Sequence, residues 1–194
     1  MYFSSEASGT EDDAKLIRQS LAGETEAFGT LVTRYQHVMY TVALRMVGNA
    51  EDARDVTQDA FVKAYRQLAT FDPHYKFFSW MYRIVINESF NVIRARRPQE
   101  PLDLKAAGHG TPFDAAVASS RHAHIEAALQ HLTPEYRSVV VLRYFGGLAY
   151  AEIAKALEIP EKTVKSRLFS ARQRLGEMLL AWKEHAKEPT NVAP

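Results

Sequence analysis

The feature that most constrains the fold of this chain is a pair of long segments with helical apolar periodicity, separated by a segment rich in proline and glycine. That separating segment, residues 98–120, contains Pro98, Pro101, Gly108, Gly110 and Pro112 and few large apolar side chains. Such a composition is typical of a flexible linker. The sequence therefore predicts an all-α protein with two small helical domains, residues 14–97 and 121–183, joined by this linker at 98–120.

The first segment predicts three helices. Apolar residues recur every three or four positions from Ala27 through Met46, and Gly48 followed by Asn49 predicts the end of this helix. A second helix is expected from about residue 50 to 68. A third is expected from about residue 77 to 96, because the proline at 98 disfavours helical backbone before it.

The second segment opens with an apolar helical face formed by Ile125, Ala128, Leu129 and Leu132. Residues 133–135, Thr-Pro-Glu, then predict a helix start, since a threonine hydroxyl can cap the helix, proline favours its first turn and an acid favours its positive end. This helix is expected to run to residue 144, where two glycines follow at 146 and 147.

The last two predicted helices form the most informative pattern. A short helix over residues 150–157 is expected to turn Ile153, Ala154 and Leu157 inward, and a break at 158–159 leads to a helix that Pro160 opens and that reaches at least residue 175. Val164, Leu168, Ala171 and Leu175 share one face of that helix. This is the layout of a helix-turn-helix, whose second helix enters the major groove of DNA.

The remaining side chains of that second helix suit base contacts. Lysine and arginine can reach guanine edges, serine can reach either base, and phenylalanine can contact a thymine methyl group. Residues 160–174 hold five basic residues and one acid, a local concentration to which a DNA backbone responds. Taken alone, the run of basic residues could simply be a charged helix face exposed to solvent. The short helix before it and the turn between them favour DNA binding.

The composition of the chain excludes several other classes of protein. The chain has 194 residues, of which 46% are hydrophobic and 24% charged, with a net charge of only +1; this is the profile of a folded protein. The lack of cysteine excludes disulfides, thiolate nucleophiles and zinc–thiolate sites. With no apolar run of about 18 residues and no basic-then-apolar N-terminus, we expect a cytoplasmic protein without membrane insertion.

Two segments, one in each predicted domain, resemble the extracytoplasmic-function sigma factors of bacterial RNA polymerase. Residues 131–154, HLTPEYRSVVVLRYFGGLAYAEIA, and the helix after them resemble region four of that family. Residues 55–61, DVTQDAF, resemble its polymerase-binding signature in region two, and residues 78–87, FSWMYRIVIN, resemble the helix that reads the −10 promoter element. The two matched segments occur in the family's order and cover most of residues 27–175.

The resemblance implies three sets of site residues. The residues implied to bind core polymerase, on the coiled coil of its largest subunit, are Asp55, Gln58 and Asp59. Their spacing would place three acceptors on one helix face, although a solvated acidic face is the plainer interpretation without the resemblance. The residues implied to bind −10 DNA are Lys76, Trp80, Arg83, Asn87, Asn91 and Arg94. The residues implied to bind −35 DNA are Lys162, Thr163, Lys165, Ser166, Phe169 and Arg172.

Finer expectations accompany these sets. The 71–76 loop matches the one that captures a base flipped from the stack, while Trp80 shares an apolar stripe with Ile84 and is expected to belong to the core. The basic cluster Arg94, Arg96 and Arg97 is expected to touch phosphate. The sequence departs from the family at Glu158, where glycine is common and a looser turn is therefore expected, and at Ser170, where a basic residue is common.

The resemblance implies a sigma factor that catalyses nothing, needs no cofactor and has three kinds of partner. These are core RNA polymerase, contacted at its coiled coil and its flap, promoter DNA, and an anti-sigma factor. An enzyme is disfavoured because the phosphate-binding Gly-x-x-x-x-Gly-Lys pattern is missing. The histidines at 122 and 124 point to different helix faces, and the one at 131 lies too far along the chain to complete a metal site with them. The closer alternative is a stand-alone helix-turn-helix regulator that binds duplex DNA without polymerase.

Overall fold

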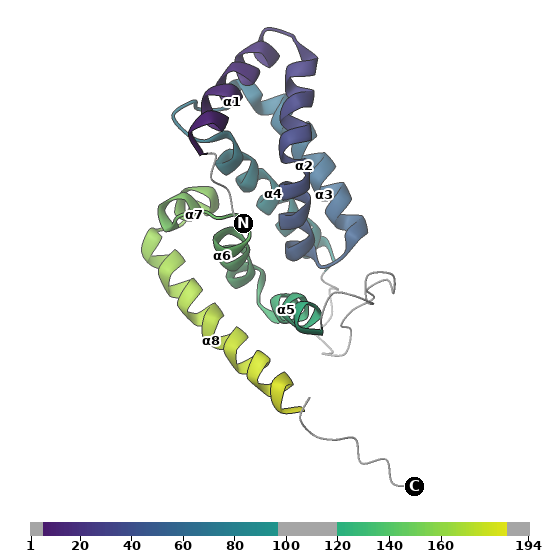
Figure 1. Ribbon diagram of the computed structural model, residues 1–194, viewed down its shortest axis with the longest axis vertical. Coiled ribbons are helices and arrows are strands. Elements are labelled where there is room, and N and C mark those ends of the chain that lie inside the picture. The colour runs from purple at the N-terminus through teal and green to yellow at the C-terminus, as the bar shows by residue number, and fades with distance from the viewer. Residues whose placement is uncertain (1–5, 97–119, 186–194) are drawn as a thin grey trace.

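The computed structural model describes residues 6–96 and 120–185, and within those ranges all regular structure is helical. The helices are α1 (Glu6–Leu21), α2 (Thr25–Val47), α3 (Ala50–Gln67), the short 3₁₀ helix η1 (Leu68–Thr70), α4 (Phe77–Ala95), α5 (Ser120–His131), α6 (Pro134–Tyr144), α7 (Tyr150–Leu157) and α8 (Glu161–His185). Figure 1 shows two helical domains, α1–α4 and α5–α8, that lie against each other. No helix in the described ranges is long and apolar enough to cross a membrane.

The first domain is built on α2, α3 and α4, whose apolar faces meet in one core. Met39, Met46, Phe77, Met81 and Ile86 are essentially inaccessible to solvent there. Gly48 ends α2 in the left-handed conformation (φ 83°), which glycine adopts without steric strain. The Asn49 side chain then caps α3 by accepting a hydrogen bond of 2.9 Å from the backbone N–H of Asp52. The predicted helices of this domain are confirmed.

Helix α1 was not predicted from the sequence. It is a mostly polar helix that contributes Ile17 to the core and packs against α2. Its attachment is also polar, because Asp13 is buried and accepts hydrogen bonds from Arg34 and from the Tyr35 hydroxyl. Burial and the Asp13 carboxylate together raise the pKa of Tyr35. Because Ile17 and the half-buried Leu16 are accompanied by polar contacts through Asp13, α1 leaves little apolar periodicity for sequence analysis to detect.

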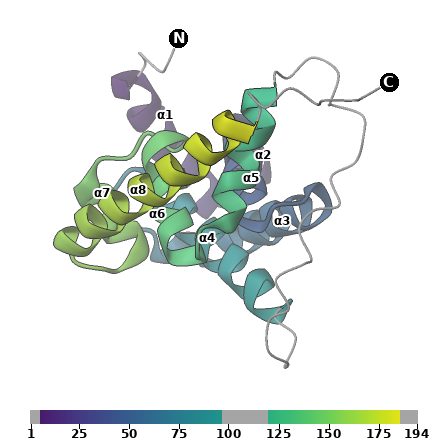
Figure 2. The same cartoon turned by 90° about the horizontal axis from the view of Figure 1, so that it is seen from below.

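The second domain encloses its own apolar core, with Leu129, Leu132, Leu142, Ile153 and Leu168 buried. Figure 2 shows α8 crossing over α5 and α6, the two helices that it packs against together with α7. Helix α6 begins where the sequence predicts, with Pro134 in its first turn. The prediction that the Thr133 hydroxyl caps α6 is wrong, because that side chain makes no capping hydrogen bond.

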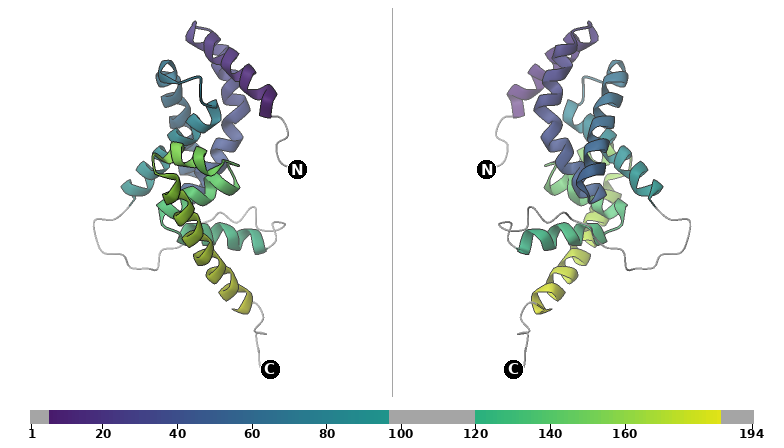
Figure 3. Two further views of the ribbon diagram at one scale, coloured as in Figure 1. Left: turned by 90° about the vertical axis from the view of Figure 1, so that its left-hand side faces the viewer. Right: turned by 90° about the vertical axis from the view of Figure 1, so that its right-hand side faces the viewer.

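The two domains meet through α2 and α4 on one side and α5, α6 and α7 on the other. At the centre of this contact the buried Arg137 of α6 donates a hydrogen bond to the carbonyl of Met46 in α2. Gln130 of α5 donates to the carbonyl of Arg45 at 2.9 Å, and the Tyr82 hydroxyl of α4 donates to the carbonyl of Gly146 at 3.4 Å. Figure 3 shows the C-terminal part of α8 extending away from the first domain.

Candidate nucleic-acid and polymerase interfaces

The predicted helix-turn-helix is formed by α7, the turn at 158–160 and α8. Val164, Leu168 and Ala171 of α8 are buried and Leu175 is half-buried, which confirms the predicted apolar face. In α7, Ile153 and Ala156 are buried, and Ala154 and Leu157 are half-buried and pack against the core, so the three side chains predicted to face inward do so.

The turn itself is tight, so the expectation of a looser turn is wrong. Glu158 adopts the left-handed conformation (φ 53°, ψ 41°) that glycine would take. The backbone N–H of Ile159 then donates to the carbonyl of Ala154 at 3.0 Å, which closes the end of α7. Among the described residues other than glycine, Glu158 alone has a positive φ. Such a conformation costs about 1 kcal/mol or more for a residue with a side chain.

The exposed face of α8 carries the predicted −35 residues. Lys162, Lys165, Ser166, Phe169 and Arg172 are exposed, and Thr163 is half-buried. Phe169 leaves 63% of its surface accessible, a large exposed fraction for an apolar side chain. Ser170, at the position where the family often has a basic residue, is half-buried. The structure thus brings the predicted −35 residues together on one side of a single helix.

Two cations on this face are held by groups of their own domain. Lys165 pairs with Glu161 at 2.8 Å, one turn earlier on α8, and this carboxylate raises the pKa of Lys165. Arg172 donates to the Tyr144 hydroxyl at 2.7 Å and to the Tyr150 hydroxyl at 3.5 Å. These hydrogen bonds, with Tyr150 contributing most, raise the pKa of Arg172. Both tyrosines escaped the sequence analysis, because they lie on α6 and α7 and only the fold brings them to Arg172.

The predicted −10 residues line one side of α4. Trp80, Arg83, Asn87, Asn91 and Arg94 follow one another at three- and four-residue spacing, which aligns them along a helix. Of these, Arg83, Asn87, Asn91 and Arg94 are exposed. Lys76 lies just before α4 and is half-buried. The structure therefore gathers this set into a continuous strip as well.

Trp80 belongs in part to the core, as expected, but it is not fully buried. Its ring is half-buried and packs against Phe71 and Phe77, with centroid separations of 5.4 and 5.8 Å. Phe71 begins the 71–76 loop, and Tyr75 in the same loop is 48% exposed. The loop is braced by Asp72, which accepts from the backbone N–H of His74 at 3.0 Å. An aromatic cluster thus connects the core of the first domain to the exposed loop.

In the basic cluster at the end of α4, Arg96 is already engaged by groups of the protein itself. Arg94 is exposed, but Arg96 forms an ion pair with Asp52 and donates to the carbonyl of Val47 at 3.1 Å. Arg96 therefore fastens the end of α4 to the junction of α2 and α3. Arg97 lies outside the described residues.

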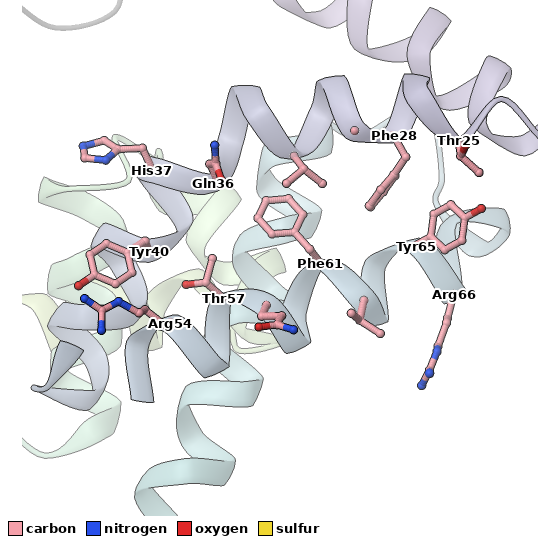
Figure 4. Close-up of a pocket in the computed structure, with 14 residues that line it drawn as sticks. Thr25, Phe28, Gln36, His37, Tyr40, Arg54, Thr57, Phe61, Tyr65 and Arg66 are labelled. Carbon is pink, nitrogen blue, oxygen red and sulfur yellow. The ribbon is translucent and has the colours of Figure 1, made fainter. Parts of the chain in front are cut away.

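The predicted polymerase-binding residues are all exposed on α3, opposite the buried Val56 and Ala60. Gln58 also helps to line an open groove of about 1040 Å³ between α2 and α3. Figure 4 shows Phe28 and Phe61 facing each other in this groove, with Tyr65 beside them. The Phe28 and Tyr65 ring centroids lie 5.0 Å apart. The structure thus adds an aromatic groove to the predicted acidic face.

Within residues 6–96 and 120–185, no three side chains of the histidine, cysteine or carboxylate type gather closely enough to hold a metal ion. His122 carries no described side chain, while His124 and His131 are exposed.

The comparisons with known proteins agree with this arrangement. Residues 31–99 match the family model for sigma-70 region 2, and residues 122–175 match the model for sigma-70 region 4. The chain is 35% identical to the RNA polymerase sigma-H factor of Pseudomonas aeruginosa over 182 residues, covering 87% of this chain and 94% of that protein. It is 34% identical to the ECF RNA polymerase sigma factor SigW of Bacillus subtilis over 178 residues, covering 85% and 95%.

A solved structure gives the same result at the level of the fold. The structure of CnrH in complex with the cytosolic domain of CnrY superposes with a TM-score of 0.69 at 30% identity, covering 88% of this chain and 98% of CnrH. A helical protein with sigma-70 region 2 in one domain and region 4 in the other is a sigma factor. The chain belongs to the extracytoplasmic-function sigma factors, which direct promoter-specific transcription initiation.

Proposed function

We propose that this sigma factor uses three separate faces, each for one partner. The exposed face of α8 reads the −35 duplex, the strip along α4 and the 71–76 loop binds the non-template strand of the −10 element, and α3 docks on core RNA polymerase. The observation that carries the proposal is that each predicted set of residues gathers along one side of a single helix or directly before it, with most of its side chains exposed.

For −35 recognition, the supporting features are the exposure and charge of α8. Lys162, Lys165 and Arg172 can reach guanine edges or phosphates, and the exposed Phe169 ring can contact a thymine methyl group. Tyr144 and Tyr150 restrain Arg172 before DNA arrives. A restrained guanidinium loses less side-chain entropy on binding.

For −10 recognition, the supporting features are aromatic and cationic. An unstacked base can stack on an exposed ring such as Tyr75, while Arg83 and Arg94 can contact the backbone of the same strand. The Trp80 ring packs against Phe71, the first residue of the loop, and so supports the loop. A single strand suits this surface better than a duplex, whose bases would present no faces to the rings.

For polymerase docking, α3 offers both charge and apolar area. Asp55 and Asp59 can accept charge-assisted hydrogen bonds from a basic helical partner. The neighbouring groove, with Phe28, Phe61 and Tyr65, can take apolar side chains of the same partner. We further propose that an anti-sigma factor regulates the protein in the cytoplasm, as the CnrH complex with a second protein suggests by analogy.

Run-off transcription tests the proposal. Core RNA polymerase is combined with a pool of bacterial promoter fragments, with and without the protein. We expect discrete new transcripts only when the protein is present, and their start sites would define both promoter elements. Sequence-specific binding of the protein alone to duplex DNA, without any new transcript, would instead indicate a conventional helix-turn-helix regulator.

A further inference from the structure

A cluster of one arginine and two tyrosines joins three helices of the second domain. Arg172 of α8 donates from Nε to the Tyr144 hydroxyl at 2.7 Å and from Nη2 to the Tyr150 hydroxyl at 3.5 Å. Tyr144 is the last residue of α6 and Tyr150 the first of α7, and these two helices pack against each other and against α8 (Figure 1). The fold therefore brings together polar groups that lie up to 28 residues apart in the sequence.

This cluster keeps hydrogen-bond donors free on its outer side. Among the residues that the structure describes, Nη1 of Arg172 meets no acceptor, and the Tyr144 hydroxyl accepts from Nε without donating its own proton. Arg172 is exposed, and Tyr144 leaves 51% of its surface accessible. A hydroxyl and a guanidinium with free donors side by side suit a ligand that offers several acceptor oxygens to both, as a phosphate does.

The frame that holds Arg172 is itself fixed. The ring centroid of Tyr150 lies 5.3 Å from the guanidinium carbon of Arg143, and Arg143 donates to the carbonyl of the buried Leu148 at 2.8 Å. An exposed arginine side chain ordinarily samples many rotamers. Because two hydroxyls hold Nε and Nη2, the free end of Arg172 is oriented before any ligand binds.

The position of Arg172 along α8 favours a phosphate over a base as its ligand. Arg172 lies eleven positions after Glu161, the first residue of α8, and hence in the fourth turn of the helix. In a helix-turn-helix, the N-terminal residues of the second helix contact base edges, and the first helix crosses the DNA backbone. Tyr150 opens that first helix, α7, so the cluster belongs to the part of the domain that faces the backbone.

We propose that Tyr144 and Arg172 form a clamp for one backbone phosphate of duplex DNA. Arg172 supplies its charge and Nη1, while Tyr144 donates its hydroxyl proton to the same phosphate and holds Nε through its oxygen. Tyr144 is then both a phosphate ligand and a positioning residue for Arg172. The clamp rests on the proposed function in that α8 is assigned to DNA, and it extends the DNA-binding surface from α8 to the end of α6.

A phosphate contact carries no sequence information, so the full chain and a labelled duplex of random sequence suffice to test the clamp. Affinity is measured by fluorescence anisotropy between about 50 and 200 mM salt. Tyr144→Phe keeps the ring and should weaken binding about three- to ten-fold, with an unchanged salt dependence because no charge is lost. Arg172→Gln should weaken binding at least as much and lower the slope of log affinity against log salt by about 0.9.

Tyr136→Phe is the matched control, because it removes a hydroxyl from the same helix, α6. The Tyr136 ring centroid lies 4.7 Å from the guanidinium carbon of Arg174, and phenylalanine keeps that contact with the ring. This variant should bind the random duplex as tightly as the unmodified protein does. Equal binding by Tyr144→Phe and Tyr136→Phe would overturn the clamp, and so would an unmodified protein that does not bind the random duplex at low salt.

A double variant tests the positioning role of Tyr144. In Tyr144→Phe/Arg172→Gln the loss of affinity should be smaller than the product of the two single losses, because either change breaks the hydrogen bond to Nε. In isotope-labelled protein without DNA, the Nε–H proton of Arg172 should exchange with water faster in Tyr144→Phe than in Tyr136→Phe. Losses that multiply, or the same exchange rate in both variants, would contradict positioning by Tyr144.

A comparison of two duplexes decides between phosphate and base. Arg172→Gln should weaken binding of the random duplex and of a −35 duplex identified by run-off transcription by the same factor. A loss confined to the −35 duplex would assign Arg172 to a base edge and overturn the clamp. Protein-dependent transcripts without an effect of Tyr144→Phe on duplex binding would remove only the clamp. Weaker duplex binding by Tyr144→Phe without such transcripts would remove only the proposed function.

Discussion

The strip along α4 and the face of α8 both carry cations suited to DNA, but their partners differ. On α8, Lys165 and Arg172 are held by Glu161, Tyr144 and Tyr150 of the same domain. Near α4, Lys76 and Arg83 are held by glutamates of the other domain. A contact within one domain orients a side chain wherever that domain moves. A contact between domains exists only while the two domains keep this arrangement. The two faces should therefore respond differently to changes at the domain contact.

The largest effect is expected at the buried centre of that contact. Arg137 donates to the carbonyls of Leu129, Gln130 and Leu132 as well as Met46. Burial lowers its pKa to about 10, so the guanidinium remains charged at neutral pH. Arg137→Met should leave these carbonyls unpaired and lower the free energy of unfolding of the second domain by about 3 kcal/mol, measured by urea denaturation.

The exposed Arg174, whose guanidinium lies 4.7 Å from the centroid of the Tyr136 ring, provides the control for that variant. Arg174→Met should change the free energy of unfolding by no more than about 1 kcal/mol. Equal destabilisation by both variants would contradict a special role for the buried guanidinium.

The next effect tests the α8 face. Lys165→Ala and Arg172→Ala should each weaken binding of the polymerase complex to −35 duplex DNA by about 1–3 kcal/mol where a base contact is lost. Fluorescence anisotropy with a labelled promoter measures this loss. Lys15→Ala, which removes one exposed charge from α1, should leave the affinity almost unchanged, and a similar loss in all three variants would point to a non-specific effect of charge.

A third expectation concerns α3, which neither DNA face includes. Asp55→Ala/Asp59→Ala should weaken binding to core polymerase about ten-fold while the circular dichroism spectrum and thermal midpoint are kept, because both side chains are exposed. Affinity is measured by titrating labelled protein with core enzyme. The exposed Glu26 of α2 gives the control, and unchanged affinity in the double variant would remove α3 from the docking surface.

The smallest effect is expected for Arg83 in the strip along α4, and it distinguishes this strip from the face of α8. Arg83→Ala should lower open-complex formation by the polymerase complex about three- to five-fold, since a contact to the −10 strand is lost. The same change should alter single-strand binding by the free protein less than about two-fold, because it also removes the pair with Glu158. Equal losses in the two assays would show that Arg83 contributes independently of the domain contact.

Much of this architecture was predictable because the spacing of apolar residues along the sequence indicates where the helices lie. The apolar faces of α2–α4 and α8 recur at helical spacing, so these helices could be located from the residues alone, whereas the three sets of site residues came from the resemblance to the sigma-factor family. Helix α1 was missed because Ile17 and Leu16 give it only a short apolar face, and the buried Asp13 attaches it through polar contacts. The contact between the domains could not be predicted either, since Arg137 and Gln130 bind backbone carbonyls, which every residue possesses.

The packing of Trp80 against Phe71 and Phe77 gives the protein a built-in optical reporter. The chain has only two tryptophans, Trp80 and Trp182, so Trp182→Phe would leave a single fluorophore beneath the 71–76 loop. An indole that is half-buried among aromatic rings changes its emission when those rings move or when a nucleobase quenches it. The moment at which a promoter strand separates could thus be timed in a stopped-flow experiment without attaching any dye.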